Sequence, residues 1–321
     1  MLLTKLLGAT LSPGGARGNL SVLIFHRVLS TPDPLFPDEP DVNRFAEILS
    51  WVGRAFNVIP LAQGLAGLKA GTLPPRALAI TFDDGYQDNF TVALPVLQRF
   101  GMHATFFVAS GFLDGGRMWN DTVIESVRAC TASRLDLDHL GLGRHDLSSP
   151  ASRRRAIDTL LPQIKYMPLI ERTDCVQRIA EAADVHLPSD LMMRSAQLAS
   201  LSDSGMEIGG HTRTHPILAR LPDADALHEI KGGKADIESI IGKGISLFAY
   251  PNGKPGKDYL ARHVDMVRSA GFQMAVSTAP GVARPGCDLF QVPRFTPWDK
   301  TATRFGLRLV SNMRFAGALA P

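Results

Sequence analysis

Short apolar runs rich in β-branched and aromatic residues alternate with helix-like segments along most of this 321-residue chain. The strand-like runs lie at 21–26, 78–82, 104–110, 206–210, 246–250, 272–277 and 290–295. The clearest helix-like segments lie at 41–56, 89–101, 224–242 and 257–271. Alternation of this kind predicts an α/β fold in which helices cover a sheet of parallel strands.

Residues 117–200 interrupt this alternation. They contain no convincing strand and have a polar, helical pattern that is clearest at 151–167 and 169–185. We interpret them as a helical insertion within one domain that spans residues 1–321, and covering a substrate groove is one role it could take. The arginines at 153–155 are expected on a solvated helix face, with contact to an anionic partner as the alternative.

The composition excludes several classes of protein. A content of 45% hydrophobic and 20% charged residues is typical of a soluble globular domain. The net charge of +3, without a dense Lys/Arg stripe, argues against nucleic-acid binding. The three cysteines form no CxxC pair, which argues against a disulfide framework and against a cysteine-bound metal (Cys130, Cys175 and Cys287). No run reaches the roughly 18–20 apolar residues of a membrane span.

Both ends of the chain predict helices. The apolar patch within residues 1–20 is broken by Lys5 and Gly8, which favours a short amphipathic helix over the alternative of an export signal. Residues 301–315 place arginines and apolar residues each at a spacing of four. We expect this helix to close the fold, with binding to an anionic membrane surface as the alternative. A cytoplasmic protein, with peripheral membrane contact left open, is our expectation.

The polar residues that could carry chemistry stand where strands end. In parallel α/β folds the active groups gather at the carboxyl ends of the strands. The residues in such positions come from four of the strand-like runs (His26, Asp83, Asp84, His211 and Arg294).

Two of these strand ends carry residues that predict a metal site. The motif HTRTH separates His211 and His215 by four residues, which on a helical turn would place both imidazoles on one face. Asp83 and Asp84 end a buried strand, where adjacent carboxylates repel unless a cation lies nearby. Two histidines and one carboxylate suit zinc or a similar divalent ion. The alternatives are a chance pair of surface histidines and a solvated Asp-Gly turn.

These motifs resemble those of a known family. TFDDGY (81–86) and HTRTH (211–215) are similar, in the same order, to the first two motifs of the polysaccharide deacetylases, the NodB-homology proteins of carbohydrate esterase family 4. Weaker similarity covers nearly the whole chain outside the insertion (FHRV at 25–28, ATFFV at 104–108, FAYPNG at 248–253 and PRF at 293–295). The resemblance implies a distorted (β/α) TIM-like barrel of about seven strands. It also implies metal-dependent removal of acetyl groups from N-acetylated sugars.

The resemblance also implies roles for individual residues. In the family's first motif the first aspartate is the base and the second binds the metal, which assigns these roles to Asp83 and Asp84. His211 and His215 become the other ligands of a divalent ion, Zn²⁺ first and Co²⁺, Ni²⁺ or Fe²⁺ as alternatives. Amide hydrolysis independently requires a polarised carbonyl, a base for water and an acid for the leaving amine.

The sequence departs from the commoner family pattern in two places. The Leu-x-His motif near the C-terminus is missing. In a branch that includes biofilm-polymer deacetylases, a histidine on the first strand is the acid instead. His26 matches that position, with a structural histidine as the alternative. The usual arginine of the third motif is also missing, so we expect Arg294 to orient the base, a surface salt bridge being the alternative.

Three further residues are predicted to contact substrate. The backbone N–H of Asn252 is a candidate oxyanion donor, and Tyr250 and Trp298 could line the sugar groove or pack in the core. Our hypothesis is a metal-dependent N-deacetylase acting on an N-acetylhexosamine in a polysaccharide, oligosaccharide or lipid-linked glycan. The alternatives are the same hydrolysis on a small non-polymer amide, and a non-catalytic sugar-binding barrel.

Overall fold

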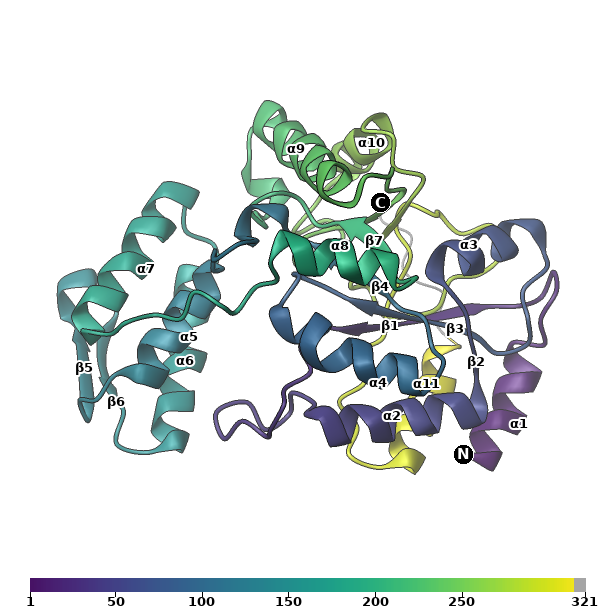
Figure 1. Cartoon of the computed structure of the whole chain (residues 1–321), viewed down its shortest axis with the longest axis horizontal. Coiled ribbons are helices and arrows are strands. Elements are labelled where there is room, and N and C mark those ends of the chain that lie inside the picture. Colours follow the sequence, from purple (N-terminus) through teal and green to yellow (C-terminus); the bar gives the residue numbers. More distant parts are fainter. Residues whose placement is uncertain (315–321) are drawn as a thin grey trace.

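The computed structural model describes residues 1–314, and its centre is a curled sheet of seven strands (Figure 1). The strand order is β1-β3-β4-β7-β8-β9, with β2 also paired to β3, and every pair is parallel. The α/β barrel expected from the sequence is therefore confirmed in the form of a half-barrel. The bounds of these strands are Leu20–Phe25 (β1), Asn57–Val58 (β2), Ala77–Phe82 (β3), Thr105–Val108 (β4), Glu207–Gly210 (β7), Leu247–Ala249 (β8) and Met274–Val276 (β9).

The strand predicted at 290–295 is not a strand. This segment instead makes single bridges, from Val292 to Val276 at one edge of the sheet and from Phe295 to Leu23 at the other. Pro293 between them has no amide hydrogen to donate, which prevents a continuous ladder. The seventh strand is β2, which is too short to give a recognisable pattern in the sequence.

Helices cover the outside of the sheet, most of them where the apolar periodicity predicts them (Figure 1). In α2 the buried residues Phe45, Ile48, Leu49 and Val52 form one apolar face, and Asp41 caps the first turn. The predicted helix at 89–101 begins as a π-helical turn at Asn89–Ala93 and continues as α4. The bounds are Val42–Ala55 (α2), Leu61–Ala70 (α3), Leu94–Arg99 (α4), Ser195–Asp203 (α8), Asp223–Ile241 (α9) and Ala261–Ser269 (α10).

The two terminal helices pack on each other. Helix α11 (Ala302–Asn312) buries Phe305 and Leu309 in the main core, so it closes the fold as expected. The last residue of the predicted helix, Phe315, lies outside the described residues. Helix α1 (Leu2–Leu11) rests on α11 through Thr4, which Gly306 admits because it has no side chain. The predicted N-terminal helix is present, but three of its five leucines are exposed (Leu2, Leu3 and Leu6). None of the described helices has the length and apolar character that crossing a bilayer requires.

The insertion forms a separate body beside the barrel, with its own apolar core (Figure 1). The expectation that it contains no strand was wrong, because β5 and β6 form an antiparallel hairpin. These strands alternate buried and exposed residues over only four positions each, too few to be recognised. Helix α8 packs on the barrel, so the insertion ends before residue 195. Its elements are α5 (Trp119–Ala129), β5 (Arg134–Leu137), β6 (Gly143–Asp146), α6 (Pro150–Ile164) and α7 (Leu169–Ala183).

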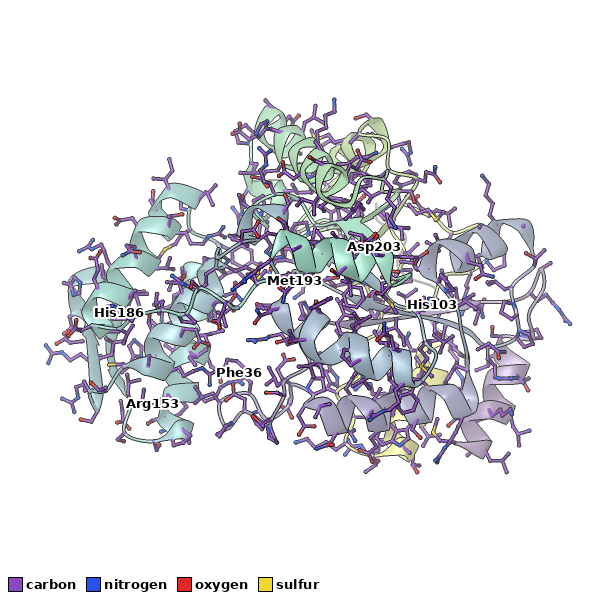
Figure 2. All side chains as sticks on the ribbon, in the orientation of Figure 1. Phe36, His103, Arg153, His186, Met193 and Asp203 are labelled. Atoms are coloured by element: carbon purple, nitrogen blue, oxygen red, sulfur yellow. The ribbon has the colours of Figure 1, made fainter. Side chains whose placement is uncertain are left out.

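The arginine run of the insertion is mostly structural. Arg153 donates to the carbonyls of Val127 and Cys130, which end helix α5 without intrahelical partners. Arg154 donates to the carbonyl of Leu35 at 2.9 Å. Two of the three arginines therefore tie segments together, and the expectation of a wholly solvated face was wrong. Figure 2 labels Arg153 and Phe36, the neighbour of Leu35, in the lower left half of the picture.

Candidate active site

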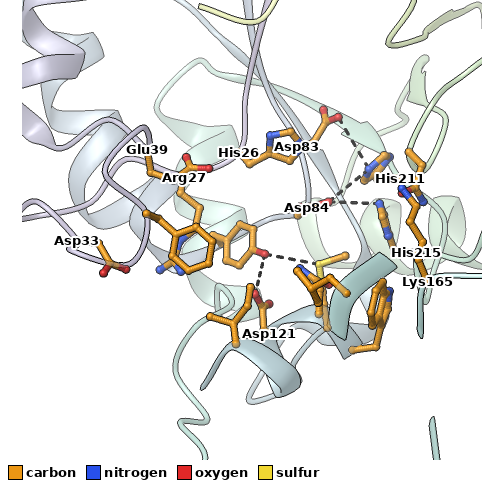
Figure 3. A pocket seen from close by; sticks show the side chains of 18 of the residues that line it. His26, Arg27, Asp33, Glu39, Asp83, Asp84, Asp121, Lys165, His211 and His215 are labelled. Atoms are coloured by element: carbon orange, nitrogen blue, oxygen red, sulfur yellow. Dashed lines mark hydrogen bonds and ion pairs between the residues drawn. The ribbon is translucent and has the colours of Figure 1, made fainter. Parts of the chain in front are cut away.

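The polar residues at the strand ends meet around a cavity of about 560 Å³ (Figure 3). Asp83 and Asp84 follow β3, and His211 follows β7, which is separated from β3 only by β4. The carboxyl ends of parallel strands share one edge of a sheet, which brings these distant residues together.

Asp84 lies between the two histidines. Its Oδ1 atom is 3.4 Å from Nε2 of His211 and 3.5 Å from Nε2 of His215. This oxygen is buried and has no hydrogen-bond donor among the described residues. Ligand atoms from the three residues lie within 4.8 Å of one another. A buried carboxylate oxygen without a partner is costly, and a divalent cation would satisfy it, so this donor set fits a metal ion.

The turn that carries Asp84 is constrained. Asp84 has a left-handed φ of 79°, which is rare for a residue with a side chain. Gly85 follows at φ 92°, and a Cβ there would lie 2.9 Å from Cγ1 of Val108 on β4. The Asp-Gly pair is therefore a tight turn at the candidate metal site, but it is buried, so the alternative of a solvated turn was wrong.

His211 and His215 do not share a helical turn, and that prediction was wrong. They belong to an irregular loop in which Thr212 and His215 have left-handed φ values of 63° and 53°. The His215 amide donates to Oγ1 of Thr212 at 3.1 Å, which folds the loop back on itself. The ring centroids of the two histidines are 4.7 Å apart. A tight loop, not a helix face, brings the imidazoles together.

Helix α9 supports this loop through two carboxylates. Glu229 accepts the amide hydrogens of Arg213 and of the next residue at 2.9 and 2.7 Å. Asp236 accepts two hydrogen bonds of 2.8 Å from the Arg213 guanidinium. Gly233 permits the close approach, because a Cβ there would lie 2.6 Å from the backbone of Thr212. The position of both histidines thus depends on α9.

Hydrogen bonding and burial define the state of the imidazoles. Nδ1 of His211 lies 2.7 Å from the carbonyl oxygen of Ala249, so it carries a proton and Nε2 faces Asp84. Burial opposes a charge on His211, but the carboxylates of Asp83 and Asp84 raise its pKa. A cation at this site would compete with that proton for Nε2. Burial lowers the pKa of His215 to about 3, so this imidazole is neutral at pH 7.

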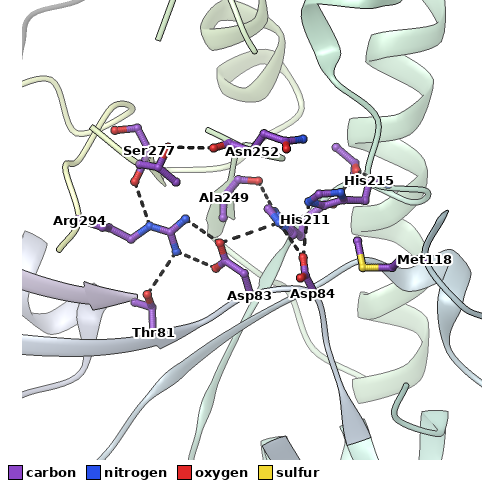
Figure 4. A network of polar contacts seen from close by, with 12 residues as sticks. Thr81, Asp83, Asp84, Met118, His211, His215, Ala249, Asn252, Ser277 and Arg294 are labelled. Atoms are coloured by element: carbon purple, nitrogen blue, oxygen red, sulfur yellow. Dashed lines mark hydrogen bonds and ion pairs between the residues drawn. The ribbon is translucent and has the colours of Figure 1, made fainter. Parts of the chain in front are cut away.

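Asp83 is paired with Arg294 in the interior (Figure 4). The two Nη atoms donate one to each carboxylate oxygen at 2.7 Å, and Nε donates to the carbonyl of Ser277 at 2.9 Å. Nη1 also donates to Oγ1 of Thr81 at 3.2 Å. Burial favours the neutral acid, but the charges of Arg294 and His211 outweigh it and lower the pKa of Asp83. The contact is a buried bidentate ion pair and not a surface salt bridge.

His26 and Asn252 line the same cavity from other strands. His26 follows β1 with an exposed side chain, and Figure 3 shows it beside Asp83. Asn252 follows β8 with a left-handed φ of 60°. Its carbonyl accepts a hydrogen bond from Oγ1 of Thr278 at 2.8 Å, whereas its amide hydrogen has no acceptor within residues 1–314. Both residues stand where a reacting group could reach them.

The structure does not bring Tyr250 and Trp298 to this cavity. Tyr250 is 0% exposed and stacks on Tyr259 with ring centroids 3.8 Å apart, so it packs in the core. Trp298 is 62% exposed and lines a separate hollow next to residues 32–41. The groove role expected for both residues depended on the direction of their side chains, which sequence spacing near irregular loops does not determine.

The sequence analysis missed the wall opposite the candidate metal site. Asp121, Ile124, Lys165 and Tyr166 come from the insertion and line the cavity together with Tyr86 of the TFDDGY motif. Tyr86 lay in a motif that had been recognised, but it was given no role. The insertion residues carried no signal, because no sequence pattern indicates that a polar helical segment faces the barrel.

The comparisons with known proteins agree with this geometry. A family model for polysaccharide deacetylases matches residues 70–136 and 174–275, which are more than half of the chain and include both motifs. The Bacillus subtilis protein YxkH, provisionally described as a polysaccharide deacetylase, is 54% identical over 33 residues. That match spans 10% of this chain and 12% of YxkH.

Solved structures share the fold. The Streptococcus pyogenes deacetylase PplD, solved in complex with acetate, has a TM-score of 0.61 and 16% identity, over 91% of this chain and 98% of that one. IcaB from Ammonifex degensii has a TM-score of 0.59 and 20% identity, over 90% of this chain and 97% of that one. From the family model, the chain belongs to the polysaccharide deacetylase family.

Proposed function

We propose that this protein is a metal-dependent hydrolase that removes N-acetyl groups from an N-acetylhexosamine of a polysaccharide, oligosaccharide or lipid-linked glycan. The observation that supports this best is the buried cluster of Asp84, His211 and His215 directly beside the ion-paired Asp83. The cluster would hold a divalent cation, for which Zn²⁺ is our first choice and Co²⁺, Ni²⁺ or Fe²⁺ are alternatives. When bound, the ion would polarise the acetamido carbonyl and make water more acidic.

The protein's own residues account for the remaining steps. Asp83, ionised beside Arg294, accepts a proton from the attacking water, and Arg294 keeps the carboxylate in one orientation. The amide hydrogen of Asn252 donates to the carbonyl oxygen as negative charge develops there. His26 protonates the leaving nitrogen as the C–N bond breaks. The products are acetate and a free amino sugar.

The alternatives differ in what they require. A non-catalytic sugar-binding barrel has no use for a buried, ionised carboxylate beside a metal site, so the Asp83–Arg294 pair favours catalysis. Hydrolysis of a small non-polymer amide would use the same residues and differs only in the shape of the substrate. The cytoplasmic location and peripheral membrane contact expected from the sequence stay predictions.

The test is acetate release from N-acetylglucosamine oligomers by zinc-loaded protein. We expect Asp83→Asn to lower kcat by about 10²- to 10⁴-fold, the usual contribution of a general base, with metal content unchanged. The matched control is Asp203→Asn, at an exposed position of α8, which should retain full activity. Equal rates in the two variants would refute the assignment of Asp83 as the base.

A further inference from the structure

The segment between β1 and α2 bridges the barrel and the insertion. Leu35 from this segment is buried in the apolar core of the insertion, with Phe36 packed beside it. Asp33 accepts hydrogen bonds of 3.0 and 2.6 Å from the two Nη atoms of Arg128 on α5. A bidentate pair of this kind is strong and geometrically specific. Because Asp33 and Arg128 both line the cavity, the bridge forms part of its wall.

A second contact joins the insertion to the barrel on another side. Tyr166, just after α6, has its ring 4.9 Å from Nζ of Lys257 and 5.6 Å from Cζ of Arg220. These cations belong to the barrel loops that follow β8 and β7. Cation–π contacts of this kind are attractive. Tyr166 and its neighbour Lys165 also line the cavity, so this contact closes another part of the wall.

The insertion re-enters the barrel directly at the motif that carries the candidate metal ligand. The amide of Gln87 donates to the carbonyl of Leu191 at 2.8 Å, and the amide of Met193 donates to the carbonyl of Gly85 at 3.0 Å. The position of the insertion is thus tied to the turn after Asp84. The insertion, although it has its own core, is therefore joined to the barrel end at several points around the cavity.

The size of this cavity suits a small ligand. Its volume of about 560 Å³ lies within the roughly 300–1,000 Å³ of pockets for drug-sized molecules. The walls described above stand on the side of the barrel end that faces the insertion. A long polymer crossing the site would need an open groove on both sides of the reacting sugar, and these walls close one of the two sides.

Three buried polar atoms of the residues that line the cavity have no hydrogen-bond partner among the described residues, and the one outside the candidate metal site belongs to Asp121. Asp121, in the first turn of α5, is 4% exposed, and its Oδ1 accepts a hydrogen bond from the Tyr86 hydroxyl at 3.1 Å. Its Oδ2 has no hydrogen-bond partner among the described residues. Arg27 lies over the ring of Tyr86 at 4.7 Å and is itself paired with Asp88. Figure 3 shows Asp121 below Asp84 and His215, among the residues that line the same cavity. A buried acceptor without a donor indicates a ligand group that donates.

We propose that the cavity binds a single N-acetylated sugar unit, free or at the end of a glycan chain, and that Asp121 anchors it by accepting a hydrogen bond from a ring hydroxyl. This inference rests on the proposed deacetylase function. Asp121 is then a substrate-binding residue supplied by the insertion, and the insertion selects for chain ends.

The first test compares N-acetylglucosamine oligomers of one to six units with zinc-loaded wild-type protein. We expect kcat/KM to vary less than about tenfold with length, and sequencing of the products by mass spectrometry to place the free amine at a chain end. A steep rise with length, with deacetylation of internal units, would overturn the inference and leave the proposed function intact. Absence of acetate from every oligomer would instead overturn the proposed function.

The second test replaces the anchor. We expect Asp121→Ala to raise KM about tenfold or more with a small change in kcat, as for loss of a buried hydrogen bond to the substrate. The isosteric Asp121→Asn should also raise KM, but by a smaller factor. It replaces Asp121→Ala in the test if the alanine variant does not fold. Asp174→Ala, at an aspartate of α7 that is 69% exposed, is the control. An unchanged KM in a folded, metal-loaded Asp121 variant would overturn the inference.

Discussion

Arg294 and Asp83 form a bidentate ion pair in the interior, in which each Nη atom donates to a different carboxylate oxygen at 2.7 Å. Both residues are only 3% exposed. Each charge therefore depends mainly on the other for compensation, since burial removes most of the solvent around both. The pair connects the end of β3 to the segment that closes the sheet, so it is structural as well as part of the proposed catalytic site.

The stability of the fold should depend on this pair as a unit. We expect Arg294→Met to cost about 3–5 kcal/mol, because it leaves the Asp83 charge buried and uncompensated. The double variant Asp83→Asn/Arg294→Met should recover much of that loss in urea unfolding. Arg268→Met, which breaks an exposed pair with Asp265, is the control and should cost less than about 1 kcal/mol. A double variant as unstable as Arg294→Met would contradict the account.

Metal affinity should depend on His215. We expect His215→Ala to weaken zinc binding by more than the roughly 10- to 100-fold typical of a residue that only orients a ligand. The measurement is metal content after dialysis against a graded series of chelator, with Co²⁺ absorption as a second readout. His186→Ala, at an exposed histidine of the insertion, should bind like wild type. If the two variants retain equal amounts of metal, the cluster is not the binding site.

The support of the histidine loop should depend on pH through Asp236. The hydrogen bond from Arg213 lowers the pKa of Asp236. The stabilisation is therefore complete above the unfolded pKa of about 3.9 and is lost as the pH falls through the lower, folded pKa. We expect Asp236→Asn to lower Tm at pH 6 by an amount worth at most about 1 kcal/mol, since the pair is partly exposed. This difference should shrink toward pH 3.

Asp265→Asn, at an aspartate that is 74% exposed, serves as the control for this titration. A Tm difference between wild type and Asp236→Asn that stays constant from pH 6 to pH 3 would show that the carboxylate charge does not support the loop.

The bridge between barrel and insertion should depend on Leu35. We expect Leu35→Ala to destabilise the protein by about 2–5 kcal/mol, because the side chain is 5% exposed within the core of the insertion. Limited proteolysis should then cut the segment 26–41 faster than in wild type. Leu2→Ala, at a leucine that is 75% exposed, should change neither quantity. Wild-type protection of this segment in a folded Leu35→Ala variant would contradict the bridge.

Local patterns predicted most elements of the barrel. Six of its strands follow continuous apolar runs, and most of the helices around them follow an apolar period of 3.6. The failures share one cause, which is that tertiary context overrode a weak local signal. Pro293 interrupts the expected last strand, and the hairpin of the insertion is too short to be recognised in the sequence. The spacing of His211 and His215 suggested a helix where contacts with α9 impose a loop.

The sequence by itself determined which residues could form the site: the aspartates after β3, the two histidines of HTRTH, His26 and Arg294. Parallel strands end at one edge, so residues at strand ends are brought together whatever the loops do. The family resemblance already separated the two aspartates, giving Asp84 to the metal and Asp83 to Arg294. Only the tertiary structure decided that the two imidazoles meet in a loop and not on a helix face. It also decided that Tyr250 is in the core and that Asp121 enters the cavity. Such side-chain positions depend on packing between segments far apart in the chain, which no local sequence pattern records.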